Sequence, residues 1–286
     1  MPMIIDCHCH AGQGDLLTAP WNTDASLGAY LRRARAAGIV RTVVFAPFHS
    51  DYMTANAQVA RIVARHPQRL IGFAFVHARR DAGRIYSMTE RAVREWGFRG
   101  LKVHGHDAMP TREVCDAARA FRIPILVDVV GQASVVEMFA PQYPDVTFIV
   151  PHLGSFQDDW RAHHQVIDQV TRFPNVYADT SGVRRFDYLL EAVKRAGPHK
   201  ILFGSDGPWL HPGLELHKIR LLGLSPRDEA MILGGNIRRL LDSAGVTPAL
   251  PPERLRPPLP ERNPRPFVAE GASGVLILKN QQENEL

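Results

Sequence analysis

Residues 4–10 read IIDCHCH, two isoleucines and an aspartate followed by two histidines that are separated by one residue. Side chains of a β-strand point alternately to opposite faces, so His8 and His10 share one face while Cys7 and Cys9 share the other. Two imidazoles on one face converge on one point, and such a pair suits zinc, manganese or iron(II). An HxH pair also arises by chance, so later parts of the chain must decide whether it is a metal site.

Short β-branched or aromatic runs recur along the chain, separated by segments with helical spacing of apolar residues. The expected strands are 3–8, 42–47, 70–76, 100–104, 125–130, 146–152, 176–180 and 201–206. The expected helices are 27–37, 57–65, 85–96, 112–121, 135–143, 161–173 and 186–196. Strand and helix alternate, with a repeat of about 24 to 28 residues after the second strand, which is typical of βα units around a parallel sheet. The sequence therefore predicts an α/β fold, a (β/α)₈ TIM barrel.

The composition changes near the C-terminus. Residues 248–267 read PALPPERLRPPLPERNPRPF, an extended, polyproline-like segment that cannot join a barrel wall. We expect two parts, a barrel over residues 1–244 and a Pro-rich C-terminal tail over residues 245–286.

Composition narrows the class of protein. With 45% hydrophobic residues among 286, the chain can bury one large core, and barrels of this length commonly form one domain. The net charge of +5 is modest and forms no dense basic face, so we expect no nucleic-acid partner. Three cysteines without a framework spacing suit a reducing compartment, and a cytoplasmic location follows as the expectation. We expect neither a signal peptide nor a membrane-spanning segment, because residues 1–10 lead straight into a strand with polar residues, and a homodimer is compatible with this class.

Polar residues stand at the ends of several expected strands, where a barrel of this kind builds its active site. They are Lys102 and His104, Asp128, His152 and Asp206. Because His152 and Asp206 stand at the ends of later strands, the sequence favours a metal site over a chance occurrence of the HxH pair. A divalent ion held there lowers the pKa of bound water enough to form hydroxide near neutral pH. Cys7 and Cys9, on the opposite face, are interpreted as small buried apolar residues.

An ordered set of motifs resembles the amidohydrolase-related (amidohydrolase 2) family, which includes the aminocarboxymuconate-semialdehyde decarboxylase group. The motifs are IIDCHCH (4–10), FRGLKVHGH (98–106), IPILVDVV (123–130), FIVPHLGSF (148–156), NVYADTSG (175–182), ILFGSDGPW (201–209) and LGGNIRRLL (233–241). The resemblance covers nearly the whole expected barrel but not the tail. It implies that His8, His10 and Asp206 bind metal and that His152 serves as an acid/base or polarising group.

One residue departs from the family pattern. Relatives usually carry a metal-binding histidine at the end of the fifth strand, where this chain has Asp128. An aspartate can also ligate a hard or borderline ion, and we favour direct ligation. The alternative is that Asp128 only orients a ligand or a water without touching the ion.

Lys102 leaves the number of metal ions open. In some amidohydrolases the lysine that ends the fourth strand is carboxylated and bridges two metals, whereas here it can also pair with Asp128 or anchor a substrate anion. The missing histidine makes a two-metal site less natural, so we expect one divalent ion, zinc before manganese.

Further residues are candidates for contacts with a small-molecule substrate, possibly a carboxylate. His104 shares the inward parity of Lys102, and Trp209 follows Asp206 on the last long loop. Arg184 follows the seventh strand and suits a bidentate clamp on a carboxylate, although capping of a surface helix is an equal alternative. His163 and His164 lie within a helical stretch, where a solvated face is the expectation.

These residues predict a metal-dependent hydrolase in which metal-activated water attacks an amide, lactone or ester. Asp206 would accept the water proton, and His152 would stabilise the developing oxyanion or transfer the proton. The alternative is a nonoxidative decarboxylase (carboxy-lyase) of an aromatic or muconate-like acid. A non-catalytic barrel that binds metal or a ligand is the alternative of another class. The weak basic balance does not favour a metal-dependent nuclease.

Overall fold

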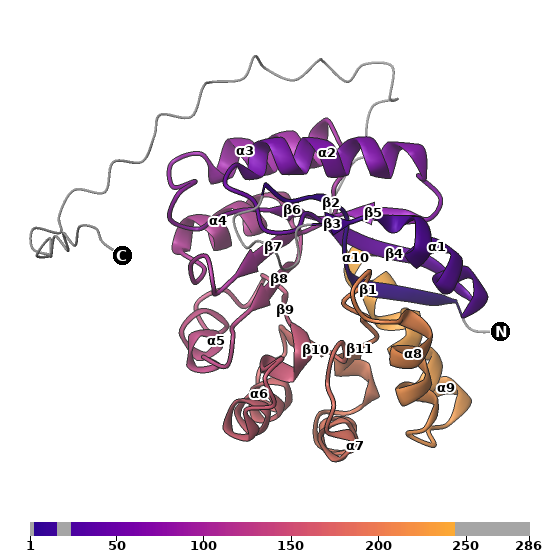
Figure 1. The fold of residues 1–286 in the computed structure, drawn as a ribbon. Coiled ribbons are helices and arrows are strands. Elements are labelled where there is room, and N and C mark those ends of the chain that lie inside the picture. The colour runs from indigo at the N-terminus through magenta and orange to yellow at the C-terminus, as the bar shows by residue number, and fades with distance from the viewer. Residues whose placement is uncertain (1–2, 16–23, 244–286) are drawn as a thin grey trace, which may run out of the picture. The chain divides into compact units, whose positions relative to one another are not determined.

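The computed structural model describes residues 3–15 and 24–243. Its parallel strands form two hydrogen-bonded runs, β1-β4-β5 and β6 to β11 in sequence order. The strands are β1 (Ile4–His10), β4 (Ile39–Phe45), β5 (Leu70–Gly72), β6 (Ala74–Phe75), β7 (Leu101–His104), β8 (Ile125–Asp128), β9 (Phe148–Val150), β10 (Val176–Asp179) and β11 (Ile201–Leu202). In Figure 1 these strands lie inside a ring of helices.

The two runs join into one closed barrel. Between β5 and β6, the Phe73 N–H donates to Val44 O (2.9 Å), and the next N–H along the chain, that of Ala74, donates to Gly100 O (2.9 Å). At the other seam, the Cys7 N–H donates to Phe203 O (2.9 Å) and the His10 N–H to Gly207 O (2.6 Å). Because β5 and β6 occupy one strand position, eight positions close the ring. The prediction of an α/β (β/α)₈ barrel is confirmed.

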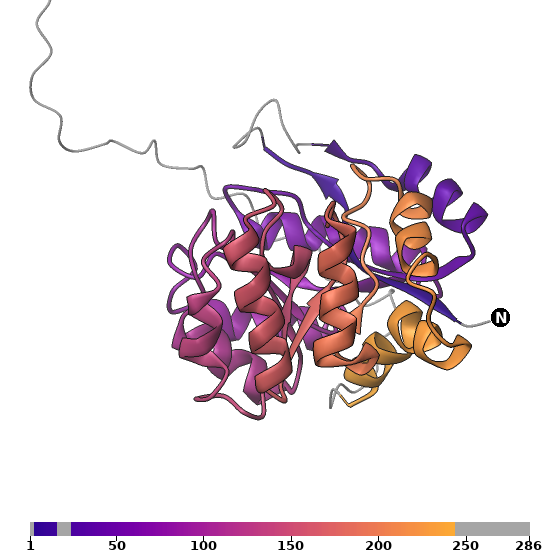
Figure 2. The same ribbon diagram turned by 90° about the horizontal axis from the view of Figure 1, so that it is seen from below.

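Helices follow most of the strands and cover the outside of the barrel. They are α1 (Leu27–Ala36), α2 (Tyr52–Arg65), α3 (Ile85–Arg94), α4 (Arg112–Phe121), α5 (Ser134–Phe139), α6 (Trp160–Arg172), α7 (Phe186–Ala196), α8 (Pro212–Arg220), α9 (Pro226–Ala230) and α10 (Asn236–Asp242). Neighbouring α6 and α7 run side by side, with the strands behind them in Figure 2. A small antiparallel pair, β2 (Gly12–Gln13) and β3 (Asp24–Ala25), follows the first strand. In the described part of the chain, no helix is long and apolar enough to cross a membrane.

The core consists of apolar side chains from the strands and from the inner faces of the helices. Phe45, Phe75 and Phe203 are completely buried. Cys7 and Cys9 are also buried and free, as expected for small apolar residues. The core fixes the strand ends, and the polar residues discussed below project from these ends.

Several expected strands end earlier than predicted, and two of them end before a residue of the site. The strand expected over 146–152 stops at Val150, and the strand expected over 201–206 stops at Leu202. His152 (φ 58°) and Asp206 (φ 54°) adopt left-handed backbone conformations, which cannot continue a strand. His152 therefore lies in a short 3₁₀ segment, Pro151–Gly154, and Asp206 in the loop after β11.

Two helices differ most from the prediction. Helix α2 begins at Tyr52, before the expected residue 57, because the Asp51 side chain accepts a hydrogen bond from the Met53 N–H and caps the helix. Helix α5 is shorter than the expected 135–143. The expected domain boundary at 244 and the Pro-rich tail over 245–286 lie outside the described residues.

Candidate active site

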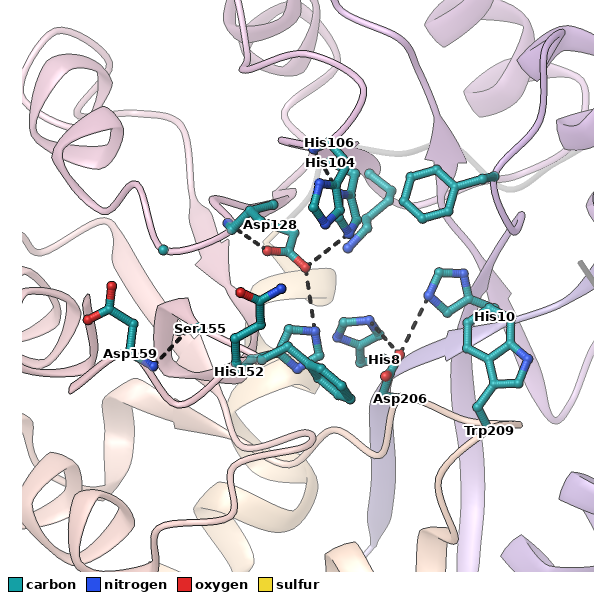
Figure 3. A pocket seen from close by; sticks show the side chains of 16 residues that line it. His8, His10, His104, His106, Asp128, His152, Ser155, Asp159, Asp206 and Trp209 are labelled. Atoms are coloured by element: carbon teal, nitrogen blue, oxygen red, sulfur yellow. Dashed lines mark hydrogen bonds and ion pairs between the residues drawn. The ribbon is translucent and has the colours of Figure 1, made fainter. Parts of the chain in front are cut away.

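A cavity of about 220 Å³ opens at the carboxyl ends of the strands. Its lining combines titratable groups with apolar and aromatic side chains: His8, His10, Phe48, Lys102, His104, His106, Asp128, Val130, Gly131, His152, Ser155, Phe156, Gln157, Asp159, Asp206 and Trp209. Figure 3 shows most of these polar groups pointing toward one another across the cavity. Most of the residues predicted from strand ends therefore meet in one place.

Three side chains form a compact donor group. His8 Nε2 and His10 Nε2 lie 3.4 Å and 3.6 Å from Asp206 Oδ1, and one donor atom from each residue lies within 4.8 Å of the others. Donor atoms bound to a tetrahedral ion at about 2.0–2.2 Å are separated by about 3.4 Å. The spacing of this triad, His8, His10 and Asp206, therefore fits a single metal ion.

The other nitrogen of each triad histidine is occupied. His8 Nδ1 donates to Asp179 Oδ2 at 2.9 Å, and His10 Nδ1 donates to Ala46 O at 3.0 Å. A proton on Nδ1 leaves the Nε2 lone pair free, and both Nε2 atoms face the gap beside Asp206. The hydrogen bonds thus select the tautomers that can bind a metal ion.

The charge states in the triad also suit a metal ion. Burial lowers the pKa of His8 to about 4, and burial lowers that of His10 as well. Burial alone would raise the pKa of Asp206, but the His10 hydrogen bond and the neighbouring imidazoles bring it to about 2. Neutral imidazoles beside an ionised carboxylate are the forms that coordinate a divalent cation.

Asp179, at the end of β10, supports both histidines that face it. Its Oδ1 accepts hydrogen bonds from the backbone N–H groups of His152 (3.2 Å) and Ser181 (2.9 Å), while its Oδ2 accepts from His8 Nδ1. The sequence alone predicts no role for Asp179, although this residue ends a strand as Asp128 does. Its place at the end of a strand was the one feature of the sequence that could have indicated a role in the site. Its pairing with His8, across 171 residues of chain, becomes visible only in the folded barrel.

Asp6 is a second buried carboxylate without a predicted role. Its Oδ1 accepts from the backbone N–H groups of His8 (3.0 Å) and Ser205 (2.9 Å). Its Oδ2 accepts from the hydroxyls of Tyr30 (2.6 Å) and Ser205. Burial raises the pKa of Asp6 to about 7. Asp6 ties β1 to the loop that carries Asp206, so it holds two parts of the triad in register.

Asp128 belongs to a different cluster on the facing wall. Its Oδ2 lies 3.2 Å from His104 Nε2 and 3.5 Å from His152 Nε2, and its Oδ1 accepts from the Val130 N–H at 2.9 Å. Figure 3 shows the carboxylate between the two rings. Burial alone would lower the pKa of His152, but the hydrogen bond and charge of Asp128 raise it to about 9. This contact stabilises a proton on His152 at the cavity wall.

Lys102, at the second position of β7, is a buried cation in the cavity lining. It is completely buried, its Nζ has no hydrogen-bond partner, and the ammonium lies 4.9 Å from the centre of the Phe45 ring. Burial lowers its pKa. A buried polar group without a partner is costly, so this nitrogen is available to an anionic group in the cavity.

Two predicted contacts lie at the cavity. Trp209 packs against the His10 ring with centroids 4.5 Å apart, and its Nε1 donates to Asp24 O at 3.2 Å. His104 lines the cavity beside Asp128 and stacks with His106 at 5.1 Å.

Arg184 lies outside the residues that line the cavity. Its exposed guanidinium pairs with Asp158 (2.7 Å) and donates to Phe156 O (3.1 Å). A clamp on a substrate carboxylate is not supported by this geometry, because its N–H groups are directed to the protein.

The prediction that His163 is solvated is wrong. The side chain is completely buried, its Nδ1 donates to Leu153 O at 3.1 Å, and its ring packs on Tyr188. The helical spacing of α6 places His163 on the inner face, while His164 remains partly exposed.

The sequence model of the amidohydrolase family matches residues 5–242, which is most of the chain. The chain belongs to the amidohydrolase family. This confirms the family resemblance drawn from the motifs. No curated protein matches this amidohydrolase.

Solved structures share the fold of this amidohydrolase at low sequence identity. A 5-carboxyvanillate decarboxylase from Sphingomonas paucimobilis has a TM-score of 0.67 and 16% identity over 86% of this chain and 100% of its own. A dihydroxybenzoic acid decarboxylase from a Polaromonas species, with bound manganese and 2-nitroresorcinol, has a TM-score of 0.62 and 19% identity over 85% and 97%. A zinc-bound amidohydrolase from Burkholderia multivorans has a TM-score of 0.71 and 15% identity over 84% and 99%.

Proposed function

We propose that this protein is a metal-dependent, nonoxidative decarboxylase of a small aromatic or muconate-like acid. The proposal rests on one observation. Lys102 and His152 line the same cavity as His8, His10 and Asp206, which are called the metal-type triad below. One side of the cavity thus offers a site for a metal ion, and the other offers a buried cation and a proton donor. Two of the structural neighbours named above are decarboxylases of aromatic acids, which supports this choice over hydrolysis.

The triad of His8, His10 and Asp206 would hold one divalent ion, zinc or manganese. Three protein ligands leave coordination positions for substrate, as in other catalytic metal sites. When bound, the ion supplies Lewis-acid binding of substrate oxygen atoms. Zinc and manganese in neighbouring structures agree with this donor set.

The cavity walls would hold and orient an aromatic anion. Phe48, Phe156 and Trp209 provide apolar surface for a planar ring. Lys102 Nζ would pair with an anionic oxygen, satisfying a cation that otherwise has no partner.

His152 would deliver the proton that completes the reaction. The bond between the carboxyl carbon and the adjacent carbon breaks, and the electron pair stays on the latter. His152 Nε2 transfers its proton to that carbon, CO₂ leaves, and solvent returns a proton to the imidazole. The hydrogen bond from His152 Nδ1 to Ser181 O (2.7 Å) keeps the ring fixed while Nε2 reacts.

Hydrolysis of an amide, lactone or ester is the second candidate. It is favoured by Asp206, an ionised carboxylate within 3.6 Å of both triad imidazoles and therefore able to accept a proton from a water in that gap. In this reaction His152 would face the substrate carbonyl.

Product analysis separates the two reactions. Purified protein loaded with zinc or manganese is incubated with hydroxybenzoates, methoxylated benzoates and muconate-like acids, and separately with lactones, esters and amides. We expect CO₂ release from at least one acid, loss of that activity with chelator, and a drop of at least about 100-fold for His152→Asn with the metal retained. Hydrolysed product without CO₂ would instead assign the protein to the hydrolases. Failure of the metal-loaded protein to convert either group would reject both reactions.

A further inference from the structure

The Asp128 carboxylate is already occupied by three protein donors. Its Oδ1 accepts from the Val130 N–H at 2.9 Å, and its Oδ2 faces two imidazole nitrogens, His104 Nε2 at 3.2 Å and His152 Nε2 at 3.5 Å. Asp128 is buried, with only 5% of its surface exposed, so solvent contributes little to its solvation. The oxygen that faces the cavity therefore serves the two rings.

The tautomer of His104 follows from its other nitrogen. His104 Nδ1 accepts a hydrogen bond from the His106 backbone N–H at 3.2 Å, so Nδ1 carries a lone pair. A neutral imidazole then has its proton on Nε2, which faces Asp128 Oδ2. The contact is an N–H donor to a carboxylate, the orientation expected of a stabilising pair.

The ring of His152 is fixed in a comparable way. Its Nδ1 donates to Ser181 O, which leaves Nε2 directed at Asp128. Asp128 therefore lies between two rings whose far nitrogens are each held by backbone groups. Removal of the carboxylate would leave both Nε2 atoms without an acceptor on this wall.

Asp128 belongs to neither of the two groups of side chains whose spacing suits a metal ion. Among residues 3–15 and 24–243, the groups of three donors within 4.8 Å of one another are His8, His10, Asp206 and His8, His152, Asp179. The second group is a hydrogen-bonded support, because His8 Nδ1 donates directly to Asp179. An ion bound by the first group would therefore have three protein ligands, and Asp128 would not be one of them.

We infer that Asp128 is a positioning residue that fixes His104 and His152 against the cavity, and that it does not ligate the metal. This inference reverses the expectation drawn from sequence. It deepens the proposed function, on which its kinetic part rests. The fifth-strand position, where the family resemblance implies a metal-binding histidine, would then serve the orientation of the proton donor and of a substrate contact.

Cobalt(II) binding tests the inference without any substrate. Wild type, Asp128→Asn and Asp206→Asn are titrated with Co²⁺, and the d–d absorption spectrum, stoichiometry and Kd are measured. Asparagine matches aspartate in size but lacks the negative charge. We expect Asp128→Asn to bind one Co²⁺ with an unchanged spectrum and a Kd within about 3-fold of wild type. We expect Asp206→Asn to bind at least about 10-fold more weakly. Thermal unfolding of each variant checks that it is folded.

Histidine ¹⁵N NMR tests the positioning directly. We expect wild-type His104 to be the Nε2–H tautomer, with its Nε2 proton hydrogen-bonded to Asp128. In Asp128→Ala, which removes the acceptor, that proton should shift upfield and exchange faster with solvent, with assignment by comparison with His104→Gln. In the kinetic arm, Asp128→Asn should lower kcat by at least about 30-fold with KM changed less than about 3-fold, since the carboxylate acts through His152.

Two results would overturn the inference. Loss of Co²⁺, or a spectral change like that of Asp206→Asn, would make Asp128 a ligand. An unchanged His104 Nε2 proton signal in Asp128→Ala would remove the positioning role. If wild type releases no CO₂ from any acid, the proposed function fails, while the Co²⁺ and NMR results still decide the role of Asp128.

Discussion

Each imidazole of the metal-type triad is held by a hydrogen bond at the nitrogen that faces away from the cavity. For His8 this acceptor is the Asp179 carboxylate, which is completely buried. A carboxylate behind a ligating histidine fixes its tautomer and increases the basicity of the metal-facing nitrogen. The affinity of the site for metal therefore depends on a residue that does not touch the ion.

Replacing Asp179 with asparagine should weaken metal binding. An amide has one acceptor oxygen, so either His8 Nδ1 or the Ser181 N–H loses its acceptor. We expect Asp179→Asn to raise the metal Kd by about 10- to 100-fold, measured by competition with a chelator. Asp187→Asn is the matched control, because Asp187 is exposed and pairs with Arg185 on the surface. Equal Kd values for the two variants would contradict this role of Asp179.

The cysteines should be unreactive in the folded protein. Burial, followed by the charge of Asp116, raises the pKa of Cys115 to about 12, and burial raises the pKa values of Cys7 and Cys9 well above their usual range. A thiolate forms only near or above its pKa, so at pH 8 the reactive form is scarce. A thiol-specific disulfide reagent should release almost no chromophore from native protein and three equivalents after denaturation in guanidinium. Rapid labelling of one native cysteine would disprove the burial.

At the scale of single residues, the sequence predicted which side chains reach the cavity better than it predicted their hydrogen-bond partners. His8, His10, His152 and Asp206 could be chosen because each stands near a strand end, and the barrel brings strand ends together. The supporting role of Asp179 could not be read from position alone, since strand ends alone do not reveal which groups will pair. His163 was misassigned because periodicity gives the spacing of a helical face and not which face is buried.

Among the elements, the segment after β9 has the most direct influence on chemistry. Residues Pro151–Gly154 turn sharply, with His152 and Leu153 both at positive φ. Gly154 follows at φ 93°, and a Cβ there would lie 2.5 Å from Val166 Cγ2 on α6. The close approach of this turn to α6 fixes where the His152 ring enters the cavity.

Alanine at Gly154 should impair both stability and catalysis. The left-handed conformation costs about 1–2 kcal/mol for a non-glycine residue, and overlap with Val166 adds about 1–3 kcal/mol. We expect the free energy of unfolding to fall by about 2–5 kcal/mol and kcat by at least about 5-fold, measured by denaturation and CO₂ release. Gly83→Ala is the control, because Gly83 has φ 79° but no neighbour within 4 Å of a Cβ. The control should lose only about 1–2 kcal/mol and keep its kcat; similar kcat values for both variants would refute the steric argument.

The order of elements was predictable, while several boundaries were not. Helices α4 (Arg112–Phe121) and α7 (Phe186–Ala196) match their expected ranges, because apolar spacing and neighbouring turn residues agree there. The expected strands could not extend to His152 and Asp206, because both residues adopt positive φ, which is uncommon outside glycine.

At the scale of the whole molecule, the metal-type triad spans the seam of the barrel. His8 and His10 belong to the first strand and Asp206 to the loop after the last, and Asp6 bonds to Ser205 across the same seam. An ion shared by the triad would therefore join the two ends of the barrel as well as bind substrate.

Metal removal should lower thermal stability. At a free metal concentration of 100 times Kd, binding to the folded state adds about 2.7 kcal/mol to the free energy of unfolding. For a barrel of this size this corresponds to a Tm about 5–10 °C higher with zinc than with chelator. Differential scanning calorimetry of wild type and Asp206→Asn provides the measurement and its control. A wild-type Tm that does not respond to metal, at concentrations that saturate the site, would exclude a link across the seam.

The bond between Asp6 and Ser205 joins residues 199 positions apart. During synthesis on a ribosome, the two histidines emerge long before the aspartate that completes their donor group. A nascent chain that has not yet reached Asp206 can bind the ion only weakly. Tight metal binding would therefore require that the last strand has been translated and that the barrel has closed.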